Sequence, residues 1–160
     1  DLPYPSDAFD LVYSWGVLHH TPDPRRAFGE AYRVLKSGST LKAMIYHVPS
    51  WTGWMVWARH ALLRGKPWTS AKQAVYEHLE SPGTDAYSVR EARELLEEAG
   101  FTDVRLQVRL GPGDLLQIKP SSRYQGAIYR VIWNLYPRWL IRALGDRFGL
   151  YMLVTAEKPG

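Results

Sequence analysis

The sequence predicts an α/β fold that ends in an antiparallel strand. Short apolar runs typical of buried strands alternate with amphipathic helical segments, and one later segment alternates strictly between apolar and polar residues. A further apolar run closes the pattern. At 160 residues, with 46% hydrophobic and 22% charged residues, the chain has the size and composition of one globular domain.

The first third of the chain predicts a strand, a helix and a second strand. The run "FDLVYS" at 9–14 is apolar enough for a strand that is buried on both faces. Asp23 followed by Pro24 is a typical helix start, because the carboxylate accepts from first-turn amides and proline fits the first helical position. Gly38 is expected to end that helix, and residues 41–46 to form the next strand.

The later part of the chain adds a second helix and two strands. Ser88 and Glu91 have the spacing of a capping box, in which each side chain binds the other residue's backbone N–H, and Gly100 is expected to end the helix that they begin. Residues 102–110 alternate as a half-buried strand does, and residues 150–156 predict the last strand.

Two stretches, 47–87 and 111–148, interrupt this scaffold and hold six of the seven tryptophans. Each stretch contains a helical apolar face, which packing explains as well as ligand recognition does. The charge is uneven, because residues 51–76 carry four bases and no acid, whereas the whole chain has a net charge of +4. The two faces consist of Trp51, Trp54, Met55, Ala58 and Leu62, and of Tyr124, Ile128, Val131 and Leu135.

Cysteine is absent, which excludes disulfides, thiolate metal sites and a cysteine nucleophile and fits a reducing compartment. We therefore expect a cytoplasmic protein. The chain begins without methionine, and its first strand signal starts by Phe9, so we also expect a fragment of a longer protein.

Residues 2–41, "LPYPSDAFDLVYSWGVLHHTPDPRRAFGEAYRVLKSGSTL", resemble the second half of class I S-adenosylmethionine-dependent methyltransferases. The family patterns L-P-F-P-x-x-x-F-D-x-V, L-H-H and E-x-x-R-V-L-K-P-G-G recur here in the same order. Ser37 and Ser39 replace the usual proline and glycine. The resemblance is close over residues 2–46 and looser over 88–156. Within the family, the sequence is similar to the ubiquinone and menaquinone methyltransferase group.

The resemblance implies the C-terminal half of a Rossmann-like seven-stranded methyltransferase sheet, with two mainly helical insertions. The core would comprise residues 1–46, 88–110 and 149–157. A missing N-terminal half of the same domain would hold the first three strands, the glycine-rich loop around the cofactor and the acidic residue that holds its ribose.

The lack of that half carries two expectations. By itself the chain is expected to be inactive, and its strand at 9–14 to form an exposed sheet edge. The motif "GPGD" at 111–114 does not replace the glycine-rich loop, because it follows a late strand, and we interpret it as a turn.

The resemblance also implies S-adenosyl-L-methionine as cofactor. Because ligands of open α/β sheets lie beyond the carboxyl ends of the strands, the turn after residues 9–14 is expected to reach the cofactor. The predicted cofactor-binding residues are Leu2, Ser14, Trp15, Gly16 and His19.

His20 and His19 are the candidate catalytic residues, since an imidazole titrates near neutral pH and suits a general base. The alternative is that they only shape the turn. A metal site is not expected, because adjacent histidines point apart and no further ligands have suitable spacing. The predicted substrate-binding residues are Tyr46, His47, Trp51 and Trp54.

The predicted function is methyl transfer from S-adenosylmethionine to a small-molecule acceptor, anionic or amphipathic, within a longer parent chain. The alternative is a non-catalytic module that binds a membrane surface or a partner and retains a methyltransferase fold remnant. A nucleic-acid partner is not expected, whereas a peripheral membrane contact fits the basic, aromatic insertions. The acceptor atom, the use of a general base and the oligomeric state stay open.

Overall fold

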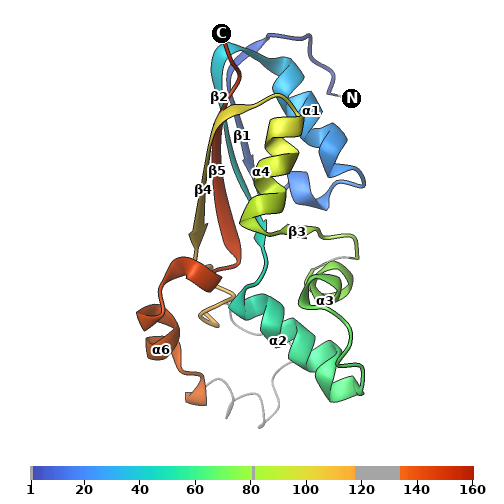
Figure 1. Ribbon diagram of the computed structural model, residues 1–160, viewed down its shortest axis with the longest axis vertical. Helices are drawn as coiled ribbons and strands as arrows, with labels where there is room; N and C mark the ends of the chain where they lie inside the picture. Colours follow the sequence, from blue (N-terminus) through green and yellow to red (C-terminus); the bar gives the residue numbers. More distant parts are fainter. Residues whose placement is uncertain (1, 81, 118–133) are drawn as a thin grey trace.

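The computed structural model describes residues 2–80, 82–117 and 134–160. A mixed sheet carries two helices on one face, and further helices lie at the end of the sheet away from both chain termini (Figure 1). None of the described helices combines the length and the apolar character needed to cross a bilayer.

Five strands form the sheet, and four of them lie side by side in the order β1-β2-β5-β4. β1 and β3 run parallel to β2, while β5 runs antiparallel to both β2 and β4. The predicted α/β fold with an antiparallel end is therefore confirmed, whereas β3 had no sequence signal. The strands are β1 (Phe9–Trp15), β2 (Leu35–His47), β3 (Ala86–Tyr87), β4 (Thr102–Arg109) and β5 (Tyr151–Glu157).

Helix α1 (Pro24–Val34) begins as predicted, because Asp23 Oδ1 accepts a hydrogen bond from Arg26 N at 3.1 Å. The predicted end of this helix was wrong. Gly38 lies inside β2 at a φ of +75°, and its N–H donates to Lys158 O at 2.9 Å. The pairing of β1 with β2 shifts register at this point, so the glycine serves an irregular strand rather than a helix cap.

Helix α4 (Val89–Glu98) lies beside α1 on the same face of the sheet (Figure 1). Its capping box is confirmed, since Ser88 Oγ accepts from Glu91 N at 3.2 Å and Glu91 Oε2 accepts from Ser88 N at 2.7 Å. Buried side chains from both helices and from alternate strand positions form the main core, including Phe28, Ala31, Leu41, Ile45, Leu96, Met152 and Val154.

The prediction that the strand at 9–14 is buried on both faces was wrong, because the face of β1 opposite the helices is open to solvent. Val12 packs against the helices, so the alternation of a strand places Leu11, Tyr13 and Trp15 on the other face. Their side chains are 49%, 65% and 51% exposed. No described strand pairs with the outer edge of β1, which confirms the predicted sheet edge within the described residues.

The stretch from 47 to 87 contains α2 (Trp51–His60), the 3-10 helix η2 (Leu62–Arg64) and α3 (Ala71–His78). The second stretch contains α6 (Arg138–Ala143) and η4 (Asp146–Phe148). Apart from Leu135, the helical face expected from Tyr124 onward lies outside the described residues.

Asp114, in the confirmed turn after β4, connects the two stretches to the sheet. It is fully buried and accepts four hydrogen bonds. One oxygen accepts from Thr52 N and Thr52 Oγ1 at 3.0 and 2.8 Å, and the other accepts from Gly111 N and Leu150 N at 2.8 and 2.7 Å. A single carboxylate thus fixes the start of α2 against the start of β5.

Candidate functional site

The site lies where the parallel strands β1 and β2 end at the same edge of the sheet. Gly16 turns the chain out of β1 at a φ of +68°, and its N–H donates to Met44 O at 3.1 Å. A side chain at Gly16 would make only ordinary contact with Met44, so the backbone conformation is what requires glycine. The 3-10 helix η1 (Leu18–His20) then places both histidines beside β2.

Two histidines, a tyrosine and a glutamate form one cluster at this edge. The His19 ring centroid lies 4.3 Å from those of His20 and Tyr46. Tyr46 Oη donates to Glu80 Oε1 at 2.6 Å, and Glu80 Oε2 lies 3.2 Å from His20 Nε2. His20 Nδ1 lies 3.1 Å from the hydroxyl of Thr84. Glu80 therefore links the phenol to the imidazole of His20.

The two histidines differ in how deeply they are buried and in what surrounds their ring nitrogens. His19 is fully buried, and burial, followed by the charge of His20, lowers its pKa to about 3. Neither of its ring nitrogens has a hydrogen-bond partner in the described part of the chain. The side chain of His20 is 24% exposed and has a carboxylate beside it. His20 is thus reachable from solvent beside a carboxylate, whereas His19 is enclosed and stays neutral.

Tyr46 acts as a hydrogen-bond donor in this cluster. Burial raises its pKa above the ordinary range, and the hydrogen bond to Glu80 and the charge of that carboxylate raise it further. The phenol therefore stays protonated and holds Glu80 in place.

Sequence reasoning missed Glu80. It follows the end of α3 and is 34 positions from Tyr46, so no local spacing connects it with the histidines. The only available signal was a carboxylate at the end of a helix in a base-rich stretch. The fold supplies the contact, because α3 leads directly into the segment that forms β3 beside the end of β2.

The structure does not bring all the predicted cofactor residues together. Leu2 and Ser14 line a largely apolar pocket of 560 Å³ between β1 and α1. Trp15 lies on the opposite face of the sheet, edge-on to Tyr151 at 6.1 Å, and His19 belongs to the buried cluster. Gly16 forms the turn between these positions.

The predicted acceptor residues also separate. Tyr46 lies in the histidine cluster, whereas His47 is buried with its Nδ1 2.9 Å from Gly149 O, at the entry to β5. Burial lowers the pKa of His47, so its imidazole is neutral. Trp51 and Trp54 contact each other, with ring centroids 5.1 Å apart, and both pack against Phe148.

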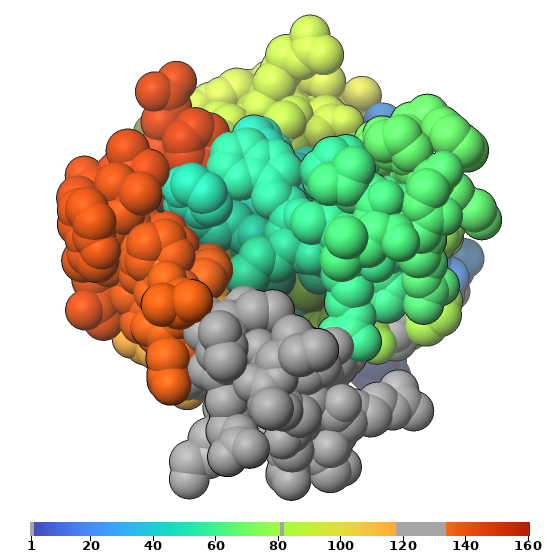
Figure 2. All heavy atoms as spheres, turned by 90° about the horizontal axis from the view of Figure 1, so that it is seen from below, coloured from blue at the N-terminus to red at the C-terminus, as the bar shows by residue number. Residues whose placement is uncertain are grey.

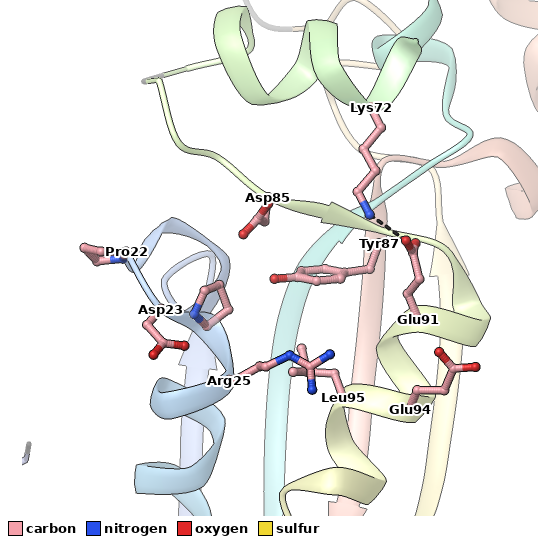
Figure 3. A pocket seen from close by; sticks show the side chains of 10 residues that line it. Pro22, Asp23, Arg25, Lys72, Asp85, Tyr87, Glu91, Glu94 and Leu95 are labelled. Atoms are coloured by element: carbon pink, nitrogen blue, oxygen red, sulfur yellow. Dashed lines mark hydrogen bonds and ion pairs between the residues drawn. The ribbon is translucent and has the colours of Figure 1, made fainter.

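A separate cleft of 320 Å³ lies between α1, β3 and α4 (Figure 3). Lys72 and Glu91 point toward one another across it and are joined by a hydrogen bond of 2.6 Å. Burial raises the pKa of Asp85 and of Tyr87, which also line the cleft. The ion pair between Lys72 and Glu91 thus holds α3 against α4. Across the described ranges, no three His, Cys, Asp or Glu side chains converge on a point that could hold a metal ion.

Comparison with known proteins identifies relatives of this chain. The family described as "Methyltransferase domain" matches residues 1–42. The 2-methyl-6-phytyl-1,4-hydroquinone methyltransferase 1 of Oryza sativa subsp. japonica is 58% identical over 38 residues, which are 24% of this chain and 12% of that protein. The demethylmenaquinone methyltransferase of Listeria monocytogenes serotype 4a is 28% identical over 109 residues, which are 66% of this chain and 46% of that protein. The matches thus span less than half of these relatives.

Solved structures share the fold. A S-adenosylmethionine-dependent methyltransferase from Thermotoga maritima superimposes with a TM-score of 0.61 at 21% identity, over 99% of this chain and 60% of that one. Phosphoethanolamine N-methyltransferase 2 from Haemonchus contortus, in complex with S-adenosyl-L-methionine, gives a TM-score of 0.57 at 17% identity, over 98% and 35% of the two chains.

The α/β sheet thus has the fold of these solved methyltransferases. The segment matched by the family contains β1, η1 and α1, which are the elements that build the site's edge of the sheet. Residues 1–42 thus match the methyltransferase domain family, in agreement with the resemblance to class I S-adenosylmethionine-dependent methyltransferases, and the described chain shares the fold of solved S-adenosylmethionine-dependent methyltransferases.

Proposed function

We propose that the protein transfers the methyl group of S-adenosyl-L-methionine to an anionic or amphipathic small molecule in the cytoplasm. The observation that carries this proposal is the cluster of His20, Glu80 and Tyr46 at the carboxyl ends of β1 and β2. Open α/β sheets bind their ligands at this edge. The family match over residues 1–42 supports the reaction class, and the absence of cysteine is consistent with the compartment.

Residues at the end of β1 fit parts of the cofactor. The pocket lined by Leu2 and Ser14 is large and apolar, and Gly16 turns the chain beside it. We assign Ser14 and the backbone of Gly16 to holding the cofactor, and leave Trp15 out of this assignment because it lies on the opposite face of the sheet. When bound, S-adenosyl-L-methionine would supply an electrophilic methyl carbon, which bonds to the acceptor's lone pair as the C–S bond breaks and its electron pair stays on sulfur in a neutral thioether.

The protein's part is to position the acceptor, exclude water and remove a proton where the acceptor carries one. His20 takes that proton on a ring nitrogen, and Glu80, 3.2 Å from His20 Nε2, stabilises the resulting imidazolium. Tyr46 positions Glu80 through its 2.6 Å hydrogen bond. His19 packs beneath both rings and stays neutral, so it is a positioning residue rather than a base.

The acceptor class is inferred from the α2 region of the chain and from the names of the relatives. Trp51 and Trp54 supply aromatic surface on α2, and residues 51–76 carry only basic charges. The two curated relatives are named for a phytyl hydroquinone and for demethylmenaquinone, which supports a hydroquinone-type acceptor with an apolar tail.

The test uses the protein expressed with the whole coding sequence that contains these 160 residues. It is incubated with S-adenosyl-L-methionine labelled in the methyl group and with hydroquinones of different tail lengths. We expect label in an organic-soluble product. If label reaches no acceptor and calorimetry detects no cofactor binding, the non-catalytic module is the better explanation.

The role of His20 is tested by matched variants. His20→Ala is expected to retain cofactor affinity and to lower kcat, while Glu80→Gln lowers kcat less and shifts its pH profile. His19→Ala is the control, because His19 contributes packing rather than proton transfer. A wild-type rate for His20→Ala from pH 6 to 8 would rule out the proposed base.

A further inference from the structure

The connection between α2 and α3 presents large apolar side chains to solvent. Leu63 is 81% exposed, Trp68 is 79% exposed and Leu62 is 48% exposed. We call these residues, together with Arg64 and Lys66, the α2–α3 corner. Figure 2 shows α2 and α3 side by side at the surface of this end of the molecule, which Figure 1 places away from both chain termini.

Hydrogen bonds give the corner a defined shape. Ala61 O accepts from Arg64 N at 3.1 Å and from Lys66 N at 2.9 Å, which closes the turn after α2. Trp57 Nε1 donates to Thr69 O at 2.6 Å and ties the far side of the connection back to α2. The turn is thus held by hydrogen bonds, and its exposed positions carry apolar side chains where polar ones would also fit. Side chains placed in this way are typical of a contact surface.

The corner is also positively charged. A pocket of 440 Å³ beside it is lined by His60, Arg64, Lys66 and His78. Burial, followed by the charges of His78, Arg59 and Arg64, lowers the pKa of His60, so cations crowd around this pocket. One carboxylate, Glu77, also lines the pocket, and Gln73 Nε2 donates to it at 2.5 Å while His78 lies 3.5 Å away. The surface complements an anionic partner.

The protruding side chains distinguish between anionic partners. Leu62 and Leu63 have neither a ring for base stacking nor a group for reading base edges, so a nucleic acid gains little from them. An anionic bilayer accounts for both the exposed apolar side chains and the positive charge of the corner. Leucine and tryptophan enter the boundary between headgroups and acyl chains, and lysine and arginine bind anionic headgroups.

We propose that the α2–α3 corner docks on a bilayer surface that contains anionic lipid. Leu63 and Trp68 enter the headgroup–acyl boundary, and Arg64 and Lys66 contact lipid phosphates. The docked face lies at the same end of the sheet as the histidine cluster, and α3 connects the two, because Glu80 follows its last turn. An acceptor with an apolar tail can then reach the cluster from the lipid. The docking itself does not depend on methyl transfer.

Vesicle flotation tests the proposal on the protein expressed with the whole coding sequence that contains these 160 residues, because floating vesicles separate bound protein from any aggregate, which sinks. Large unilamellar vesicles of phosphatidylcholine are compared with vesicles in which roughly a third of the lipid is phosphatidylserine. We expect flotation with the anionic vesicles, at least about tenfold weaker binding to the neutral ones, and loss of binding in high salt. Equal binding to both vesicle types, or none to either, would overturn the proposal.

Two double variants locate the contact. Leu63→Ser with Trp68→Ser, and separately Arg64→Gln with Lys66→Gln, should each weaken flotation by about tenfold or more. The control is Leu135→Ser with Trp139→Ser, which changes the same residue types at 76% and 74% exposure elsewhere on the surface. It should float like the wild type. Loss of flotation in this control instead, or binding of the corner to RNA without flotation, would contradict the proposal.

The variants are interpretable because the mutated side chains are exposed and leave the core intact. Far-UV circular dichroism and the unfolding midpoint should therefore match those of the wild type. These measurements separate a docking defect from a folding defect.

Discussion

The buried carboxylate of Asp114 makes a sharp prediction about stability. In Asp114→Asn, one oxygen that accepts two hydrogen bonds becomes an NH₂ group. The best arrangement turns the remaining oxygen toward Gly111 N and Leu150 N. The NH₂ group then faces Thr52, whose hydroxyl can rotate and accept, but Thr52 N is left without an acceptor.

The magnitude follows from these groups. An orphaned buried donor costs about 1–3 kcal/mol, and the two remaining bonds weaken when their acceptor loses its charge, so the total is about 2–5 kcal/mol. That is a large part of the roughly 5–15 kcal/mol by which a folded domain is stable. For a chain of this size, the midpoint of thermal unfolding should fall by roughly 5–15 °C.

Thermal and urea unfolding, followed by tryptophan fluorescence, measure this loss. The control is Asp10→Asn, which removes an exposed ion pair with Lys36 and should leave the midpoint nearly unchanged. A midpoint for Asp114→Asn that equals the control's would refute the idea that this carboxylate holds α2 and β5 together.

Three further predictions concern glycines and a buried histidine. Gly149→Ala should destabilise the fold by about 3 kcal/mol or more, because the added Cβ would overlap the carbonyl of Arg109. Gly29→Ala in α1 is the control, since its Cβ has no atom within contact distance and should stabilise the helix by about 0.5–1 kcal/mol. Urea unfolding of both variants measures the two changes. Gly16→Val should lower the thermal midpoint more than Gly16→Asn, since asparagine tolerates the left-handed conformation, and equal effects would contradict this. Because the pKa of His19 is low in the folded state, the unfolded chain binds a proton between pH 6.5 and about 3 that the folded chain does not, so the wild type loses stability as the pH falls through this range. His19→Phe should therefore gain stability relative to the wild type over the same range. A difference in unfolding free energy that does not change with pH would contradict this prediction.

Local signals in the sequence predicted those elements whose causes are local. Asp23 and Ser88 start their helices because their side chains cap amides a few residues ahead. The strict alternation after residue 102 likewise predicted β4, because one face of that strand is half-buried and the other is exposed.

The errors and omissions arise from contacts between distant residues. Gly38 has the local appearance of a helix cap, but its N–H binds Lys158 O, from the far end of the chain, and the segment joins the sheet. The same reason hid Glu80, whose role depends on where α3 ends relative to β2. His19, His20 and Tyr46 could be named from the sequence, but the difference in burial between the two histidines could not.

The way β2 is shared among its neighbours has consequences for how the molecule moves. Its residues 41–44 pair with β1 on one edge and β5 on the other, and beyond β1 the same edge passes to the two-residue strand β3. Amide hydrogens in 41–44 can exchange with solvent only when much of the sheet opens, whereas those of Ala86 and Tyr87 need only a local opening. The histidine turn lies at this junction, where His19 O accepts from Asp85 N. One wall of the site is therefore as slow to open as the whole domain, whereas the opposite wall, which carries Thr84, can open on its own.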